Sequence, residues 1–257
     1  MDARLRGKVA LITGASGGIG GGIARVLAAE GASLAMADLR PPPPELVSEL
    51  REAGARPLVL DVDVSREPDV VRMVAETVGA FGRVDLFVSN AAVAWHQPFI
   101  EVTSEAWHAT LNANLSACLW GCREMARHLI EQRSGSILIV GSVAALHPSY
   151  GQVSYSASKL ALRSLCQTLA IEMAPYGIRV NSLLPGHHET ALTAGLSPAE
   201  AEAVRIEIPL QHFGSFEACG RAAAFLLSDA LSPYTTGAEL VVDGGLQLRP
   251  LRMPMTS

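Results

Sequence analysis

Short apolar runs alternate with longer amphipathic stretches along the whole chain. Seven of these runs have the length and β-branched content typical of strands: Val9 to Ile12, Ser33 to Ala37, Pro57 to Leu60, Asp85 to Ser89, Ser136 to Val140, Ile178 to Leu184 and Glu239 to Val242. Strands that alternate with helices predict a parallel sheet, whose right-handed crossovers place helices on both faces. We therefore expect an α/β fold with a doubly wound, seven-stranded, Rossmann-like sheet and functional residues at the carboxyl ends of its strands.

The length and composition fit one domain. With 257 residues, 49% hydrophobic and 18% charged, the chain can bury one large core, so we expect a single domain over residues 1–257. The segment 186–213 is interrupted by two prolines and is longer than a usual strand-to-helix link, which predicts a partly helical substrate lid. The tail 246–257 has no clear period, and we expect it to be disordered or packed on a neighbouring subunit.

The charge pattern disfavours nucleic acid and membranes as partners. The net charge is −5, and no cluster of Lys or Arg stands out. A long uncharged stretch, Ile137 to Ser158, contains glycine, proline and several serines, which a membrane span would not carry. The N-terminus runs into the first strand without an apolar signal stretch, so we expect a cytoplasmic protein.

The cysteines and paired histidines do not predict a metal site. Four cysteines without a secretory signal are expected to be reduced thiols packed in the core. Cys118 and Cys122 stand at helical spacing, and His187 directly precedes His188. Consecutive residues do not face one ligand in regular structure, however, and no further pair has ligand spacing. We therefore predict no metal.

A glycine-rich segment follows the first predicted strand and opens a helix. Gly14 permits a tight turn, Gly18 leaves no Cβ between the backbone and a pyrophosphate, and Gly20 lets the helix pack closely on the sheet. The helix N-terminus then faces the phosphates. A simple turn is the structural alternative, which the position after the first strand disfavours. The predicted phosphate contacts come from Gly14, Ser16, Gly17, Gly18, Ile19 and Gly20.

Asp38 ends the second predicted strand, about twenty residues beyond the glycines. A carboxylate at this place can accept hydrogen bonds from both ribose hydroxyls of an adenosine, which favours NAD over NADP. Two alternatives remain: Asp38 can serve as a helix cap, and Arg40 can attract a 2′-phosphate instead. No basic residue occurs at positions 15–18 or at Leu39, so we predict NAD.

Two residues at the start of a helical stretch indicate acid/base chemistry. Tyr155 and Lys159 open the stretch Ser154 to Ala174 four positions apart, so they share one helix face. A free tyrosine is a poor base at neutral pH, but a neighbouring ammonium stabilises the phenolate. Ser142 follows a predicted strand at the carboxyl edge, where its hydroxyl can bind a substrate oxygen, and Asn114 completes the group. Each residue alone has a structural alternative, whereas their joint occurrence favours catalysis.

These motifs occur along nearly the whole chain in the order found in the short-chain dehydrogenase/reductase family, which the sequence resembles. The glycine segment Thr13 to Gly20 is similar to the family's T-G-x-x-x-G-x-G. The remaining similar segments are Asp63 and Val64 (adenine-contacting D-V), Asn90 and Ala91 (N-A-G), Asn114, Ser142, Tyr155 and Lys159 (catalytic tetrad), Pro185 and Gly186 with Thr190 (P-G-x-x-x-T), and Asp243 to Gly245 (D-G-G).

The resemblance implies a role for each of these residues. Tyr155 would be the general acid/base, Ser142 would hold the substrate oxygen, and Asn114 would order a proton-relay water. Lys159 would stabilise the phenolate and hold the nicotinamide ribose. Further cofactor contacts are implied for Asp63, Val64, Asn90, Tyr155, Lys159, Pro185, Gly186 and Thr190. The family also implies a homotetramer, with the helices near 104–130 and 154–174 at one interface and the last strand at another.

Three departures from the family pattern concern the ligand sites. Ala92 replaces the glycine of N-A-G, which adds a methyl group near the expected adenosine. Ser89 replaces a common asparagine. The insert His187 to Glu189 is more polar than the residues the family often carries, so it can alter how the loop covers the nicotinamide.

The residues that flank the predicted tetrad are our candidates for the substrate pocket: Trp95, His96, Ala144, His147, Gln152, His187 and Leu192. They combine aromatic and neutral polar groups without Lys or Arg, so a carboxylate substrate would lack a charged anchor. Each histidine has an alternative as an exposed loop residue. The sequence does not name the substrate.

The sequence thus predicts an oxidoreductase that transfers a hydride between NAD(H) and a neutral secondary alcohol, polyol or ketone. One alternative is a 3-oxoacyl reductase-like activity with NADP(H). Another is a non-catalytic nucleotide-binding regulator, since a fold alone does not imply catalysis. The complete tetrad argues against the regulator.

Overall fold

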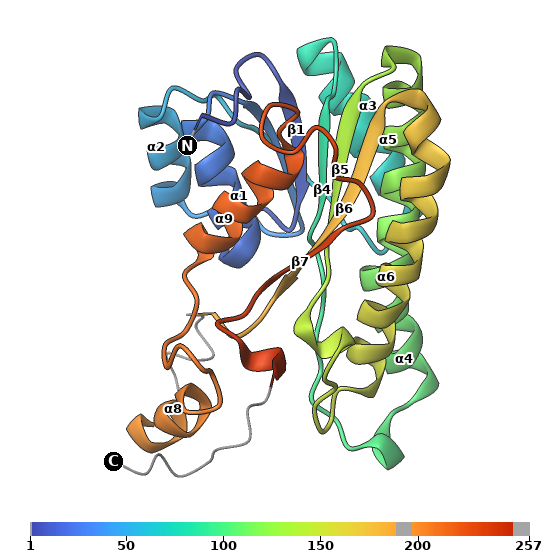
Figure 1. The fold of residues 1–257 in the computed structure, drawn as a ribbon. Helices are drawn as coiled ribbons and strands as arrows, with labels where there is room; N and C mark the ends of the chain where they lie inside the picture. The colour runs from blue at the N-terminus through green and yellow to red at the C-terminus, as the bar shows by residue number, and fades with distance from the viewer. Residues whose placement is uncertain (1, 189–196, 249–257) are drawn as a thin grey trace.

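A parallel sheet of seven strands crosses the middle of the molecule (Figure 1). The computed structural model describes residues 2–188 and 197–248. Within these residues the strands lie in the order β3-β2-β1-β4-β5-β6-β7, and all neighbours are parallel, so the predicted doubly wound sheet is confirmed. The strands are β1 (Val9–Thr13), β2 (Ser33–Asp38), β3 (Leu58–Asp61), β4 (Leu86–Ser89), β5 (Gly135–Val140), β6 (Ile178–Pro185) and β7 (Glu239–Val242).

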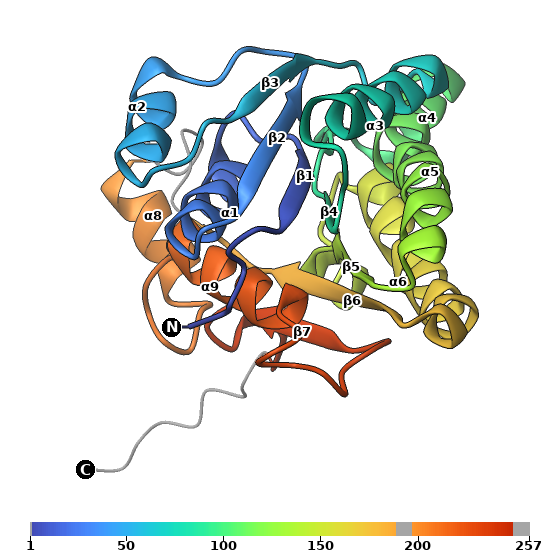
Figure 2. The same ribbon diagram turned by 90° about the horizontal axis from the view of Figure 1, so that it is seen from above.

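Helices cover both faces of the sheet, as Figure 2 shows from above. One face carries α1 (Gly18–Ala29), α2 (Pro44–Glu52) and α9 (Phe216–Leu227), and the other carries α3 (Glu67–Phe81), α5 (Ala117–Gln132) and α6 (Val153–Met173). The helix expected near 104–130 is divided: α4 (Ser104–Leu111) passes through a π-helical turn, Asn112–Ser116, into α5. Short 3-10 turns occupy Phe99–Glu101, Val143–Ala145, Ala174–Tyr176 and Leu246–Leu248.

The core consists of two apolar layers, one on each face of the sheet. Along β1, Ala10 and Ile12 face the layer beneath α1 and α9, whereas Val9 and Leu11 face the layer beneath α3 and α5. Successive side chains of a strand point to opposite faces. A strand buried on both sides therefore needs apolar residues at every position, which explains the continuous apolar run that predicted it.

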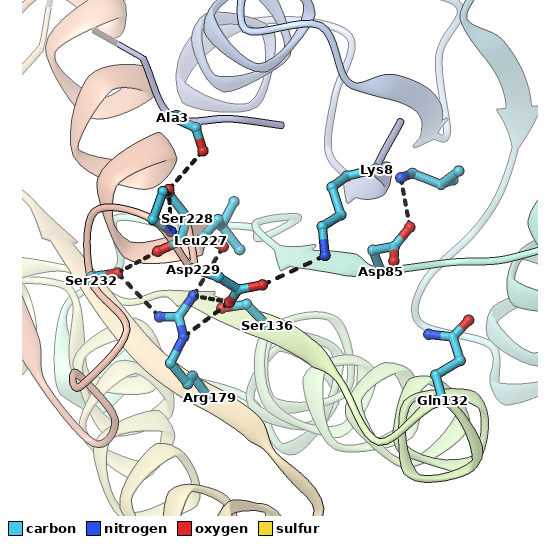
Figure 3. Close-up of polar contacts among 12 residues, drawn as sticks. Ala3, Lys8, Asp85, Gln132, Ser136, Arg179, Leu227, Ser228, Asp229 and Ser232 are labelled. Atoms are coloured by element: carbon cyan, nitrogen blue, oxygen red, sulfur yellow. Dashed lines mark hydrogen bonds and ion pairs between the residues drawn. The ribbon is translucent and has the colours of Figure 1, made fainter. Parts of the chain in front are cut away.

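A polar network centred on Arg179, near the start of β6, lies at the amino-terminal ends of the strands (Figure 3). The guanidinium of Arg179 donates to the carbonyl of Leu226 at 2.7 Å, to that of Leu227 at 3.0 Å and to the carboxylate of Asp229 at 3.0 Å. Lys8 approaches Asp229 at 3.5 Å. Because these bonds join β6 to the end of α9, the network stabilises the edge that lies away from the carboxyl ends.

The opposite, carboxyl edge collects the turns that carry the predicted motifs. Helix α8 (Pro198–Arg205) and the turn Leu246–Leu248 both lie at this lower end of the molecule in Figure 1. Helix α8 is the described helical part of the predicted lid 186–213, and residues 189–196 lie outside the described residues. Among the described helices, none is long and apolar enough to cross a membrane.

Candidate active site

The glycine-rich segment forms a tight turn between β1 and α1. Gly14 has φ +64° and Gly18 has φ +53°, a backbone region that residues with a Cβ rarely adopt. A Cβ at Gly20 would overlap the carbonyl oxygen of Gly14, so only glycine lets the helix start this close to the strand. These contacts account for two of the three glycine roles expected from the sequence.

The N-terminus of α1 is left open toward this turn. Gly17 precedes the helix with extended backbone, no side chain caps the first amides, and the first turn contains no acidic residue. A Cβ at Gly17 would meet nothing within 4 Å. Free helix amides beside open space suit the phosphates of a dinucleotide, since the amides and the helix dipole both favour negative charge.

A groove of about 740 Å³ extends from this turn along the ends of β2 and β3. Of the predicted cofactor residues, Gly14, Asp38, Asp63 and Val64 line it. Ala92, the departure from the family's glycine, also lies on its wall. The groove therefore has the place and the size for the adenosine half of a dinucleotide.

Asp38 stands at the end of β2 with both carboxylate oxygens in use. Oδ2 accepts from the amide of Ser16 at 3.0 Å, and Oδ1 accepts from the amide of Arg40 at 3.2 Å. The hydroxyl of Ser16 donates to the carbonyl of Arg40 at 2.6 Å. Each carboxylate oxygen keeps a second lone pair for a ribose hydroxyl. Arg40 lines the same groove.

Asn90 supports the glycine turn of the cofactor site. It is not among the described residues that line the groove. Its side-chain amide donates to the carbonyls of Thr13 and Gly14, both at 3.0 Å. Its backbone amide donates to the hydroxyl of Thr13 at 3.0 Å. Asn90, which follows β4, therefore holds the turn in place, and its direct contact with the cofactor stays a prediction.

Tyr155 and Ser142 both line a second cavity, and Lys159 is buried beside the Tyr155 ring. Lys159 is only 3% exposed, and its ammonium donates to the carbonyl of Val140 at 2.9 Å. The ammonium lies 5.6 Å from the centroid of the Tyr155 ring, as their spacing on one face of α6 predicts. The Ser142 hydroxyl oxygen accepts a hydrogen bond from the backbone amide of Ala144 at 3.1 Å. The hydroxyl proton of Ser142 is not used in this bond, so it can be donated to another group.

Asn114 lies in the π-helical turn and joins this group through Ser158. Its amide donates to the hydroxyl of Ser158 at 3.0 Å, which in turn donates to the carbonyl of Tyr155 at 2.7 Å. The amide also donates to the carbonyl of Val93 at 2.9 Å, while Oδ1 accepts from the amide of Val93 at 2.8 Å. Both donor hydrogens are therefore committed, and only an acceptor site on Oδ1 is left to bind a water. π-Helical turns of this kind are frequent at functional sites.

The second cavity has a volume of about 490 Å³. Of the predicted substrate residues, Ala144, His147, Gln152 and His187 line it. Trp95 lies instead on the dinucleotide groove, and His96 is absent from the described lining but contacts Gln152 at 3.0 Å between the two Nε2 atoms. Leu192 and Thr190 lie outside the described residues.

Several residues of this cavity were not expected from the sequence: Ala94, Val143, Ser149, Glu207, Leu246 and Gln247. Ala94, Val143 and Ser149 neighbour predicted residues, so a wider window around the tetrad would have found them. Leu246 and Gln247 belong to the predicted tail, where the absence of periodicity did not indicate a site. Glu207 lies within the predicted lid 186–213, but no local pattern distinguished it from the other residues of that segment. Pro185 ends β6, and Gly186 after it lines the cavity, where a Cβ would come within 2.5 Å of the Cβ of Asp243.

The paired histidines point to different surroundings. His187 lines the cavity, where burial and then the neighbouring His188 lower its pKa. His188 is 4% exposed. Its Nδ1 contacts the carbonyl of Gly186 at 2.9 Å, and its Nε2 contacts the thiol of Cys219 at 3.0 Å. It stacks on Phe216 with ring centroids 6.1 Å apart. No group of three His, Cys, Asp or Glu able to hold a metal occurs among the described residues.

Comparisons with known proteins agree with this geometry. Residues 14–247 match the family described as enoyl-(acyl carrier protein) reductase. The chain is 35% identical over 246 residues to the 3-oxoacyl-[acyl-carrier-protein] reductase of Thermotoga maritima, covering 95% of this chain and 99% of the relative.

Solved structures give the same result. A putative short-chain alcohol dehydrogenase from Sinorhizobium meliloti 1021 superposes with a TM-score of 0.92 at 30% identity, covering 97% of this chain and 100% of that one. An NAD⁺-bound xylitol dehydrogenase superposes with a TM-score of 0.86 at 28% identity, covering 94% and 100%. The chain belongs to the short-chain dehydrogenase/reductase family, a family of oxidoreductases that use nicotinamide cofactors.

Proposed function

We propose that this protein oxidises a neutral secondary alcohol or polyol, or reduces the corresponding ketone, with NAD(H). The observation that carries the proposal is that Tyr155 and Ser142 line one cavity while the buried ammonium of Lys159 lies 5.6 Å from the centroid of the tyrosine ring. Such a group can move a proton at a substrate oxygen, which is the acid/base half of alcohol oxidation.

The chain's own residues each take a definite part. Ser142 donates a hydrogen bond to the substrate oxygen and orients it toward Tyr155. Tyr155 takes the hydroxyl proton of an alcohol, or gives a proton to a ketone oxygen in the reverse direction. Lys159 stabilises the phenolate by its charge, and Asn114 fixes the start of α6 through Ser158. The nicotinamide, when bound, supplies the hydride acceptor or donor.

The proposal of NAD rests on Asp38. Its carboxylate lies on the groove that suits the adenosine, where it can accept from two ribose hydroxyls and repel a 2′-phosphate. Gly14, Ser16 to Gly20, Asp63, Val64, Pro185 and Gly186 would hold the remainder of the dinucleotide. Binding of NAD⁺ by the similar xylitol dehydrogenase is consistent with this preference.

A 3-oxoacyl reductase activity with NADP(H) is the second candidate. It is favoured by the similarity to the Thermotoga maritima enzyme and by Arg40, which lies on the dinucleotide groove and can pair with a 2′-phosphate. The lack of any Lys or Arg among the described residues of the substrate cavity supports the neutral alcohol instead.

A substrate panel tests both candidates. Purified protein is incubated with secondary alcohols, linear and cyclic polyols, the matching ketones and a 3-oxoacyl thioester, each with NAD(H) and with NADP(H), and nicotinamide absorbance is followed. We expect turnover of a neutral alcohol–ketone pair with NAD(H). Turnover of the thioester alone would favour the reductase, and NADH binding without any turnover would favour the regulator.

A further inference from the structure

One wall of the substrate cavity comes from segments far from the catalytic residues in the sequence. Glu207 follows α8, and Leu246 and Gln247 follow β7. Glu207 provides the one carboxylate among the described residues that line the cavity, and these include no Lys or Arg. The cavity therefore carries a negative charge at a place that the catalytic residues do not explain.

Glu207 is placed by neighbours that are packed tightly on the turn after β7. Ile208 is 1% exposed, and a Cβ added to Gly244 would lie 2.7 Å from its Cγ2 atom. The amide of Leu210 donates to the carbonyl of Gly244 at 3.1 Å. Gly244 has φ +65°, so a side chain here would be strained as well as crowded. This close approach fixes the backbone on which Glu207 reaches the cavity.

Gln247 is held by the same turn. Oδ2 of Asp243 accepts from the amide of Gln247 at 2.7 Å, and Oδ1 accepts from the amide of Gly245 at 2.8 Å. The D-G-G segment thus has two structural consequences. It precedes the 3-10 turn that contains Gln247. The segment that contains Glu207 packs on it through Ile208 and Leu210. Glu207 and Gln247 therefore line the same cavity from two segments that pack on one turn.

We propose that Glu207, together with Gln247, selects polyhydroxy substrates without a negative charge. The carboxylate would accept a hydrogen bond from a hydroxyl remote from the carbon that reacts beside Tyr155, and Gln247 can donate to or accept from a neighbouring hydroxyl. The same carboxylate repels substrates that end in a carboxylate or a phosphate. This inference rests on the proposed alcohol dehydrogenase function and names the class of alcohol.

The size of the discrimination follows from the position of the charge. Glu207 is solvent-exposed, so its repulsion of a second anion several ångströms away is screened by water and is worth about three- to tenfold in affinity. The selection should therefore weaken at high ionic strength. A hydrogen bond from a hydroxyl to the carboxylate depends less on salt.

The test compares a neutral and an anionic substrate of equal length. We would measure kcat/KM for a five-carbon polyol, with xylitol tried first, and for the aldonate of the same chain, using the wild type, Glu207→Gln and Glu207→Lys. Glu202→Gln is the matched control, because it makes the same charge change on α8 at an exposed residue that pairs with Arg205 and does not line the cavity. Thermal midpoints verify that each variant is folded.

We expect the wild type to prefer the polyol at least about tenfold. Glu207→Gln should raise kcat/KM for the aldonate about three- to tenfold and change that for the polyol less than about threefold, since the amide keeps an acceptor. Glu207→Lys should raise the aldonate value further, and high salt should shrink these differences.

Two results would overturn the inference, and they differ from each other. An aldonate-to-polyol ratio that shifts equally in Glu207→Gln and Glu202→Gln, or in neither, would show that Glu207 does not select substrates, while leaving the dehydrogenase function intact. No turnover of any alcohol or ketone by the wild type would reject the dehydrogenase function and this inference with it.

Discussion

The ammonium of Lys159 lies 5.6 Å from the centroid of the Tyr155 ring while it donates to the carbonyl of Val140 at 2.9 Å. The carbonyl bond anchors the charge to the end of β5, so the ammonium faces the tyrosine without depending on a bound ligand. The packing of α6 against the end of β5 therefore fixes the position of the Lys159 ammonium relative to Tyr155.

Removal of the Tyr155 hydroxyl should abolish turnover without loss of cofactor binding. Tyr155→Phe deletes one oxygen, and acid/base assistance is typically worth about 10²–10⁴-fold. We expect kcat to fall by at least about a hundredfold and NADH binding, followed by fluorescence, to stay near the wild type. Tyr150→Phe is the control, since Tyr150 is exposed nearby and does not line the cavity among the described residues. A Tyr155→Phe variant that keeps more than about a tenth of kcat would show that another group transfers the proton.

Removal of the Asp38 carboxylate in Asp38→Ala should narrow the preference for NAD over NADP, mainly by weakening the binding of NAD. A 2′-phosphate about 4 Å from a carboxylate costs roughly 1 kcal/mol in water and about 4 at a partly buried site. We expect the wild type to favour NAD over NADP at least about tenfold in kcat/KM at fixed substrate. Asp61→Ala is the matched control, because Asp61 lies beside Asp38 in register on β3 but does not line the described groove. Equal use of both cofactors by the wild type would indicate that Arg40 binds the phosphate.

His188 should make stability fall on acidification. Because the Gly186 carbonyl can only accept, Nδ1 carries the proton and Nε2 accepts from Cys219 in the neutral ring. Burial lowers its pKa below the ordinary value of 6.5. As pH falls below that value, the unfolded chain takes up a proton before the folded one, so the free energy of unfolding decreases.

Urea denaturation at pH 7.5 and 5.5 measures this effect. We expect His188→Gln to be less stable than the wild type at the higher pH and to lose less stability between the two, since it cannot be protonated. His187→Gln separates the contribution of the cavity histidine, whose pKa is also lowered. Equal loss in the wild type and in His188→Gln would assign the pH dependence to other groups.

Arg179 should contribute strongly to stability. Its guanidinium donates to the carbonyls of Leu226 and Leu227 and pairs with Asp229, and the side chain is largely buried (Figure 3). Arg179→Met leaves those carbonyls without their donor, which costs about 2–4 kcal/mol. Arg221→Met is the control, since its pair with Glu217 on α9 is exposed and worth less than about 1 kcal/mol. Thermal or urea unfolding compares the two, and similar losses would contradict the role given to the network.

We propose that the protein is a homotetramer and expect light scattering at micromolar concentration to give four times the chain mass. Leu160 and Ile171 on α6 and Leu119 on α5 are exposed apolar residues on the helices expected to meet a second copy. Leu160→Glu should lower the measured mass by burying a charge at that interface, whereas Val59→Glu on β3 should not. A wild-type monomer would contradict the proposal.

The sequence by itself was sufficient wherever the information is local. The strands were recognisable because a strand covered on both faces carries a continuous apolar run, as Val9 to Ile12 of β1 and Ile137 to Val140 of β5 do. The glycine turn and the spacing of Tyr155 and Lys159 depend on backbone geometry within one turn or one helix, so their structures follow from a few adjacent residues. Tyr155 and Lys159 were identified on this basis, whereas Ser142 was identified from its position after a predicted strand and Asn114 from the resemblance to the family.

The tertiary structure alone decided which distant residues share the substrate cavity and which way neighbours point. His187 and His188 are adjacent in sequence, yet one lines the cavity and the other is buried against Cys219. Glu207 reaches the cavity because Ile208 packs on Gly244, a contact between segments more than thirty residues apart that no periodicity encodes. Local patterns describe how each segment folds, whereas the charge of this cavity depends on which segments pack against one another.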